Sequence, residues 1–285
     1  MKPLSITRRR GAGSQVEGER LEYMSMPKGM DVYEPPRLPE AEQVAAAPEG
    51  LSVLQQVADA LLRGVGSHDN ETLEIAALTA IDRTVVNQVL GEGEVSAIID
   101  NGDGVRVSVQ ESLLAGVWRL ITTRGEAIER DTIEIGAVPL LFRQAAMLDW
   151  GAERPAWQGP LPPNVLNAPA LVEEVRDQSA RWKPGQDAHV INLTLLPVTM
   201  EDIGFLDHEI GTGSLLVLSR GYGNCRITNT RMRYGWRVVY YNSMDKVILN
   251  TVEITDIPQV MMAAPEDIRD AHERLVDLLH ILRED

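Results

Sequence analysis

Three sequence segments of the first half recur in the second half, in the same order and each about 120 residues later. The pairs are Gly91-Glu92-Gly93 with Gly211-Thr212-Gly213, Trp118-Arg119 with Trp236-Arg237, and Thr132-Ile133-Glu134-Ile135 with Thr251-Val252-Glu253-Ile254. A spacing this constant predicts one structural unit that the chain uses twice, with small changes in loop length. The period is too long for a solenoid of short repeats.

Both copies have the same predicted order of helices and strands. In the first copy, the spacing of apolar residues predicts helices over 51–62 and 82–90, and strands over 73–78, 94–99, 105–110, 117–122 and 132–135. In the second copy it predicts helices over 171–182 and 201–210, strands over 190–196, 215–219, 226–229, 235–241 and 247–254, and a closing helix from 265. The predicted fold class is therefore α+β, with two tandem similar α/β repeats, mainly antiparallel sheets and flanking helices.

Proline marks the segments outside the repeats. Residues 1–48 are polar and Pro-rich, and we expect an extended or disordered N-terminal arm there. The repeats then span 49–150 and 170–285, joined by a Pro-rich linker over 151–169. The arm carries Met26, Pro27, Met30 and Tyr33, which suit either a strap over the core, the favoured interpretation, or a surface that contacts a guest protein.

Charge and cysteine content exclude several classes of function. The 27 basic and 42 acidic side chains give a net charge of −15, which argues against nucleic acid or an anionic membrane surface as a partner and favours a basic protein segment. A single cysteine, Cys225, rules out an intramolecular disulfide and Cys-rich zinc or iron–sulfur sites. No apolar run reaches the roughly 18 residues that span a bilayer. We expect a cytoplasmic protein without direct membrane insertion.

Catalytic and cofactor motifs are weak. Both Gly-x-Gly pairs follow a predicted helix and open a strand, the reverse of a dinucleotide-binding loop, so we interpret them as helix ends. The five histidines lack metal-ligand spacing, and no nucleophile motif is present. We therefore predict no catalytic residue, no metal site, no cofactor and no enzyme activity. Trp118 and Trp236 are expected in the core or at a pseudo-symmetric interface, and Glu134 and Glu253 on a solvated strand face.

One turn differs strongly between the copies. The first copy has the acidic Asn101-Gly102-Asp103-Gly104, whereas the second is basic and aromatic. Because function in a duplicated protein concentrates where the copies diverge, we predict that this turn binds a partner. Its residues are Arg220, Gly221, Tyr222, Gly223, Asn224, Cys225 and Arg226. Cys225 is either a thiol activated by the neighbouring arginines or, as we favour, a small buried hydrophobic residue.

Several segments resemble those of the HupH/HyaF family of hydrogenase expression proteins. The most specific is Ser219 to Ile227, followed by Asn250 to Ile254. Gly91 to Val95, Gln110-Glu111-Ser112 and Gly116 to Arg119 resemble the first half of that family, and Met26 to Met30, running on to Glu40, is similar to its N-terminal motif. The resemblance covers nearly the whole chain.

The resemblance implies an accessory protein for the maturation of uptake [NiFe]-hydrogenases. Such a protein binds the iron–sulfur small-subunit precursor, which carries a twin-arginine signal, before export, and it can also meet other hydrogenase accessory proteins. Besides a structural subunit of a larger maturation complex, two alternatives of different classes stay open from the sequence. One is a chaperone that binds the precursor without chemistry of its own. The other is a maturation factor with thiol-based redox or cluster-protection chemistry at Cys225.

Overall fold

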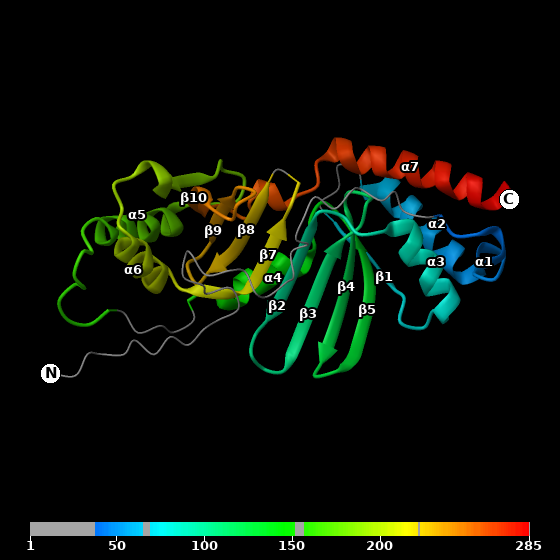
Figure 1. Ribbon diagram of the computed structural model, residues 1–285, viewed down its shortest axis with the longest axis horizontal. Coiled ribbons are helices and arrows are strands. Elements are labelled where there is room, and N and C mark those ends of the chain that lie inside the picture. The colour runs from blue at the N-terminus through cyan, green and yellow to red at the C-terminus, as the bar shows by residue number, and fades with distance from the viewer. Residues whose placement is uncertain (1–37, 65–68, 152–156, 222, 285) are drawn as a thin grey trace. The chain divides into compact units, whose positions relative to one another are not determined.

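The computed structural model describes residues 38–64, 69–151, 157–221 and 223–284 (Figure 1). This part of the chain divides into two compact units. The first unit takes in described residues up to 144 together with 217–224 and 257–284, and the second takes in 145–216 and 225–256. The units interleave along the chain, so the domain boundaries given above remain predictions about the repeat in the sequence.

The first repeat contains five strands that pair side by side and antiparallel. The strands are β1 (Glu71–Glu74), β2 (Val95–Asp100), β3 (Val105–Glu111), β4 (Val117–Arg124) and β5 (Ala127–Ile135). They lie in the order β1-β5-β4-β3-β2, and each neighbouring pair is antiparallel. The helices are α1 (Ala41–Ala45), α2 (Pro48–Gly64), α3 (Ala80–Leu90) and, after the sheet, α4 (Leu140–Asp149).

The core of the first unit lies between its helices and β4–β5. The C-terminal helix α7 (Pro265–Glu284) packs beside α2, although the two are separated by most of the chain (Figure 1). Leu54 and Leu61 of α2 and Leu275 of α7 are completely buried together with Ile133 of β5. Burying such side chains stabilises a fold by about 2 kcal/mol each, so α7 is an integral part of this unit.

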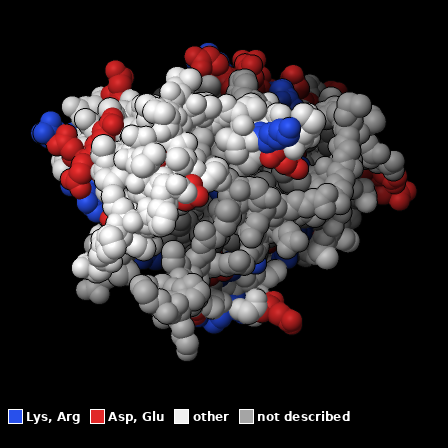
Figure 2. Space-filling view, turned by 60° about the vertical axis from the view of Figure 1, so that its left-hand side comes forward, with Lys and Arg blue, Asp and Glu red and all other residues white. Residues whose placement is uncertain are grey.

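The second repeat follows the same strand order. Its elements are α5 (Ala168–Arg181), β6 (His189–Asn192), the 3₁₀ turn η1 (Leu193–Leu195), α6 (Met200–Ile210), β7 (Thr212–Ser219), β8 (Asn224–Thr230), β9 (Gly235–Tyr241), β10 (Val247–Ile254) and η2 (Gln259–Met261). The order β6-β10-β9-β8-β7 matches β1-β5-β4-β3-β2 of the first repeat. The predicted α+β fold built from two similar repeats is confirmed. Figure 2 brings the α5–α6 side of the molecule forward.

Residues that cap helices explain why the repeat can be recognised in the sequence. Thr79 and Thr199 occupy the N-cap positions of α3 and α6, and each accepts the amide of the residue three positions later. Gly91 and Gly211 end the same helices with φ of 58° and 68°, a backbone region that favours glycine. The Gly-x-Gly pairs are therefore helix ends, as predicted.

Three predicted extended segments are wrong in part. The strand predicted over 73–78 instead spans Glu71–Glu74. Residues 41–45, expected in the extended arm, form α1, because Glu40 and Gln43 cap each other reciprocally and Val44 is buried. The strand predicted over 190–196 ends at Asn192, whose side chain accepts the amide of Thr194 at 3.0 Å and starts η1. The rest of the predicted arm, residues 1–37, lies outside the described residues. Within the described ranges, no helix has the length and apolar character needed to cross a membrane.

Candidate functional site

The predicted partner-binding turn contacts the segment of the first unit that carries Glu94. The Arg220 N–H donates to the Glu94 carbonyl at 3.1 Å. Gly221 lies against the Glu94 carboxylate, since a Cβ at this position would be 2.1 Å from Glu94 Oε2. Gly93 in turn donates its N–H to the Glu111 carbonyl at 2.7 Å. The turn therefore lies beside the residue that precedes β2, and β2 is paired with β3, which ends at Glu111.

The residues of the turn differ in accessibility. Arg220, Gly221 and Gly223 are exposed, and Asn224 and Arg226 are half-buried. Cys225 is 3% exposed. Gly223 has φ of 103°, so a side chain there would strain the backbone. Tyr222 and the arm residues Met26, Pro27, Met30 and Tyr33 lie outside the described residues. Partner binding by this turn stays a prediction.

Glu111 adds a titrating carboxyl to this site that sequence reasoning missed. Burial raises its pKa to about 7, with a further contribution from the Glu94 carboxylate and, more weakly, from Asp267. Hydrogen bonds from the Gly116 and Val95 amides act in the opposite direction. A carboxyl with this pKa is about half protonated near pH 7. The sequence holds little signal for it, because the shift depends on strand packing.

The buried Cys225 of β8 lies near the half-buried Tyr240 of β9 and Glu253 of β10 in the second unit. Burial raises the pKa of its thiol to about 12, and Tyr240, which hydrogen-bonds to it, only partly offsets this effect. Burial likewise raises the pKa of Tyr240 to about 12 and shifts that of the nearby Glu253 upward. The thiol is protonated at neutral pH, which fits the interpretation of Cys225 as a buried residue and gives no support to an activated nucleophile.

Native Cys225 is expected to react with iodoacetamide about 10³-fold more slowly at pH 7.5 than the same cysteine in the urea-unfolded chain, because thiolate abundance falls tenfold for each unit by which the pKa exceeds its ordinary value. The chain contains one cysteine, so mass spectrometry of the intact protein reads the site directly. Labelling of the native protein at the unfolded-chain rate would show that the thiol is accessible and ionised, and would restore the redox alternative.

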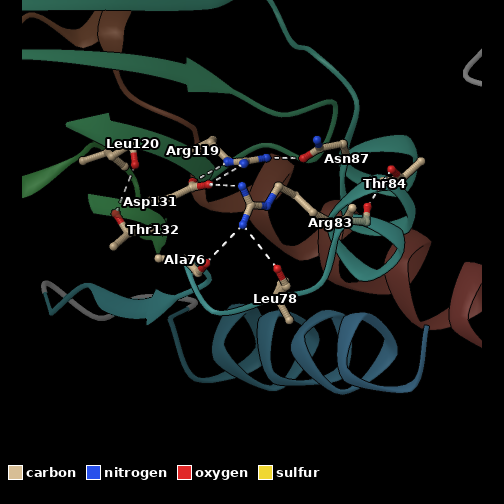
Figure 3. Close-up of polar contacts among 10 residues, drawn as sticks. Ala76, Leu78, Arg83, Thr84, Asn87, Arg119, Leu120, Asp131 and Thr132 are labelled. Atoms are coloured by element: carbon tan, nitrogen blue, oxygen red, sulfur yellow. Dashed lines mark hydrogen bonds and ion pairs between the residues drawn. The ribbon is translucent and has the colours of Figure 1, made fainter. Parts of the chain in front are cut away.

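Two half-buried arginines around the buried Asp131 tie α3 to β4 and β5 in the first unit (Figure 3). The Arg119 guanidinium donates two hydrogen bonds of 2.8 Å to the Asp131 carboxylate and a further one to the Asn87 side-chain oxygen. Arg83 of α3 approaches Asp131 at 3.9 Å and donates to the carbonyls of Ala76 and Leu78. Asp131 is 2% exposed, so these hydrogen bonds replace the water that its carboxylate loses on burial.

The second repeat contains the same cluster with acid and amide exchanged. Arg237 donates to Asp207, on α6, at 2.9 Å and to the side-chain oxygen of Asn250, on β10. In the first repeat the helix supplies the amide, Asn87, and the strand supplies the acid, Asp131. Each arginine therefore keeps one carboxylate and one amide, which indicates a structural role that both copies retain.

The tryptophans confirm their predicted core position, whereas Glu134 does not lie on a solvated face. Trp118 and Trp236 are at most 1% exposed, and their ring N–H groups donate to the carbonyls of Gly136 and Thr255. Glu134 is 5% exposed and accepts the Leu140 amide at 2.7 Å, at the start of α4. The solvated-face prediction is wrong for Glu134 because its carboxylate caps a helix that the sequence pattern did not reveal.

No group of three or more His, Cys, Asp or Glu side chains in the described ranges is arranged to hold a metal ion. His208 instead contacts Glu209 at 3.1 Å, and His189 contacts Glu174 at 3.0 Å. These are pairs of side chains on or beside α5 and α6. The candidate site remains the Arg220–Gly221 turn with Glu94 and Glu111, and its binding of a partner stays a prediction.

A family model described as the C-terminal conserved region of HupH hydrogenase expression proteins matches this chain twice, over residues 45–149 and 165–282. The two matches coincide with the two repeats. The chain belongs to the HupH family. The segments that carry this resemblance include Glu94, Glu111 and Arg220, so HupH-like motifs meet at the candidate site.

Curated relatives in the HupH family match nearly the whole chain. The hydrogenase expression/formation protein HoxQ of Cupriavidus necator is 50% identical, with 94% of each chain covered. HupH of Rhodobacter capsulatus is 42% identical over 96% of each chain. The hydrogenase-1 operon protein HyaF of Escherichia coli is 31% identical, with 96% of this chain and 95% of HyaF covered.

Proposed function

We propose that this protein is an accessory factor of hydrogenase maturation that binds the iron–sulfur small-subunit precursor of an uptake [NiFe]-hydrogenase before twin-arginine export. Membership of the HupH family, with whole-length relatives named as hydrogenase expression or formation proteins, is the observation that carries the maturation role. In this proposal the protein acts by contact and not by turnover. Other hydrogenase accessory proteins are further candidate partners.

Two features of the chain support this proposal, one on the chemistry of the client and one on the contact surface. The net charge of −15 favours a client segment that carries basic residues, such as the start of a twin-arginine signal. The exposed Arg220–Gly221 turn is hydrogen-bonded to the Glu94 carbonyl, and Glu111 lies beside Glu94. A turn fixed by its neighbours loses little conformational entropy on binding, which favours its use as a contact surface.

Affinity capture tests the proposal. The tagged protein, expressed together with the hydrogenase operon, is expected to retain the unprocessed small subunit, identified by mass spectrometry, and deletion of the signal from that subunit is expected to reduce retention at least tenfold. Arg220→Ala combined with Tyr222→Ala is expected to weaken capture. Arg130→Ala, which removes an exposed arginine of β5, is the matched control. An eluate without any hydrogenase protein, while the precursor accumulates in the cell, would contradict the proposal.

A further inference from the structure

Four large apolar side chains of the second unit are turned toward solvent. They are Leu166 before α5, Leu195 and Leu196 at η1, and Met200 at the start of α6, with exposures of 72%, 79%, 39% and 53%. Single exposed apolar residues are ordinary in soluble proteins, whereas a contiguous group of them marks a contact surface. We call these four residues the leucine–methionine surface.

Hydrogen bonds place the two segments that carry this surface side by side. The Asn167 side chain donates to the Pro197 carbonyl at 2.6 Å, and the Thr199 hydroxyl donates to the Asn164 carbonyl at 2.8 Å. Each member of the leucine–methionine surface lies within two residues of one of these bonded positions. The four side chains therefore belong to one area of the second unit.

The same area is held rigidly. Asp202 is completely buried, and its Oδ1 atom accepts the amides of Leu166, Asn167 and Ala168 at 2.7, 2.8 and 2.9 Å. The Leu166 backbone is thus fixed to the first turn of α6, next to Met200. A rigid surface loses little conformational entropy when a partner binds. Burial of its apolar area therefore contributes more fully to affinity.

Charge is missing from both segments. No Asp, Glu, Lys or Arg occurs from Trp157 to Val172, and none occurs from Ala188 to Met200, in a chain that is 24% charged. Figure 2 shows a broad area of mostly uncharged atoms on the side that carries α5 and α6, interrupted by a few charged atoms. The residues that follow the two segments are the exposed acids Glu173 and Glu201. The surface is therefore apolar with acidic neighbours.

We propose that the leucine–methionine surface docks an uncharged apolar segment of a partner polypeptide that is flanked by lysine or arginine. The apolar segment covers the four side chains, and its basic flanks face the acids and the net charge of −15. A second copy of this chain fits less well, because a symmetric contact would bring Glu201 and a like net charge against themselves. The inference rests on the proposed function in one respect, that the client is a polypeptide.

Peptide titration tests this site in the full-length protein. Two fluorescent probe peptides share one alternating leucine–alanine core, and one is flanked by lysines and the other by glutamates. By fluorescence anisotropy the lysine-flanked peptide is expected to bind at least tenfold more tightly than the glutamate-flanked one. Leu166→Glu with Leu195→Glu is expected to weaken its binding at least tenfold, whereas Leu62→Glu, at a 63% exposed position of α2, is expected to leave it within twofold.

Three results would overturn the proposal. The first is unchanged peptide binding by the Leu166→Glu, Leu195→Glu variant, with circular dichroism confirming its fold. The second is a concentration-dependent dimer in light scattering that this variant abolishes, which would assign the surface to a second copy. The third is a tenfold gain in peptide affinity on deletion of residues 1–37, which would assign it to this chain's own N-terminal segment.

Affinity capture separates this proposal from the proposed function. If the hydrogenase precursor is captured equally by the wild type and by the Leu166→Glu, Leu195→Glu variant, the client does not use this surface and only the present inference fails. If the lysine-flanked peptide binds at the surface but no hydrogenase protein is ever captured, the surface stands and the proposed client is wrong. Loss of capture in the variant alone supports both.

Discussion

Asp202→Ala is expected to destabilise the second unit by about 3–4 kcal/mol, measured by urea unfolding. The carboxylate accepts the amides of Leu166, Asn167 and Ala168 through Oδ1 and that of Thr199 through Oδ2. It therefore satisfies donors at the start of α5 and at the N-cap of α6 at the same time. Alanine leaves these amides without an acceptor at a completely buried position, and a helix start without its acid.

The equivalent substitution in the first repeat, Asp82→Ala, provides the control. Asp82 accepts the Gly50 amide at 2.8 Å and the hydroxyl of Thr79, together with backbone hydrogen bonds from Glu49 and Thr79, so it serves fewer backbone donors than Asp202. Its loss is expected to cost less than the loss of Asp202. An equal loss of unfolding free energy for the two substitutions would show that water replaces Asp202 as the acceptor for the three amides ahead of α5. The carboxylate would then not hold the two helices together.

Acid titration of stability gives a second measurement on Asp202. Burial opposes its ionisation, but the amides of Thr199, Ala168, Leu166 and Asn167 outweigh this effect and lower the pKa from about 3.8 to about 2. A lowered pKa means that the contribution to stability is complete above pH 4 and is lost as the pH falls toward 2. The expected loss is about 2 kcal/mol. Asp202→Asn is expected to lose this part of the pH dependence, and a profile unchanged by that substitution would refute the assignment.

Features set by neighbouring residues were predictable from the sequence. The repeat, most helices and strands, and the helix ends at Gly91 and Gly211 follow from local rules: apolar periodicity, cap residues and glycine at positive φ. The antiparallel sheets follow because successive strands are joined by short turns. The exposed turn at Arg220 was also visible, as the place where the two copies diverge in charge.

Features set by distant partners were not predictable. Helix α4 starts where Glu134 accepts the Leu140 amide, and the same carboxylate is held by Asn70, 64 residues away in the chain. The pKa of Glu111 depends on Glu94 across a strand pair. Periodicity carries no information about such contacts, because they join polar residues whose spacing is set by the folded chain. The packing of the C-terminal helix α7 against α2 was likewise not predictable, because an amphipathic pattern does not identify the element that it packs against.

Arg119→Ala is expected to cost the first unit about 3–5 kcal/mol in urea unfolding, because it leaves the Asp131 charge at 2% exposure with only the more distant Arg83. Arg237→Ala in the second repeat is expected to cost clearly less. Its acid, Asp207, is 43% exposed and remains solvated when the arginine is removed. If Arg237→Ala destabilised the protein more than Arg119→Ala, the burial of the partner acid would not determine the loss of stability.

Because acid and amide are exchanged between the repeats, a second substitution is expected to restore the stability lost when Asp131 is replaced. Asp131→Asn alone removes the buried carboxylate from Arg119 and is expected to cost about 2 kcal/mol. Adding Asn87→Asp recreates the arrangement of Arg237 with Asp207 and Asn250, and is expected to recover more than half of that loss. Recovery stays incomplete because Arg83 also faces Asp131, whereas Ile203 occupies the matching position in the second repeat. Additive costs of the two substitutions would mean that the repeats satisfy their arginines by unrelated means.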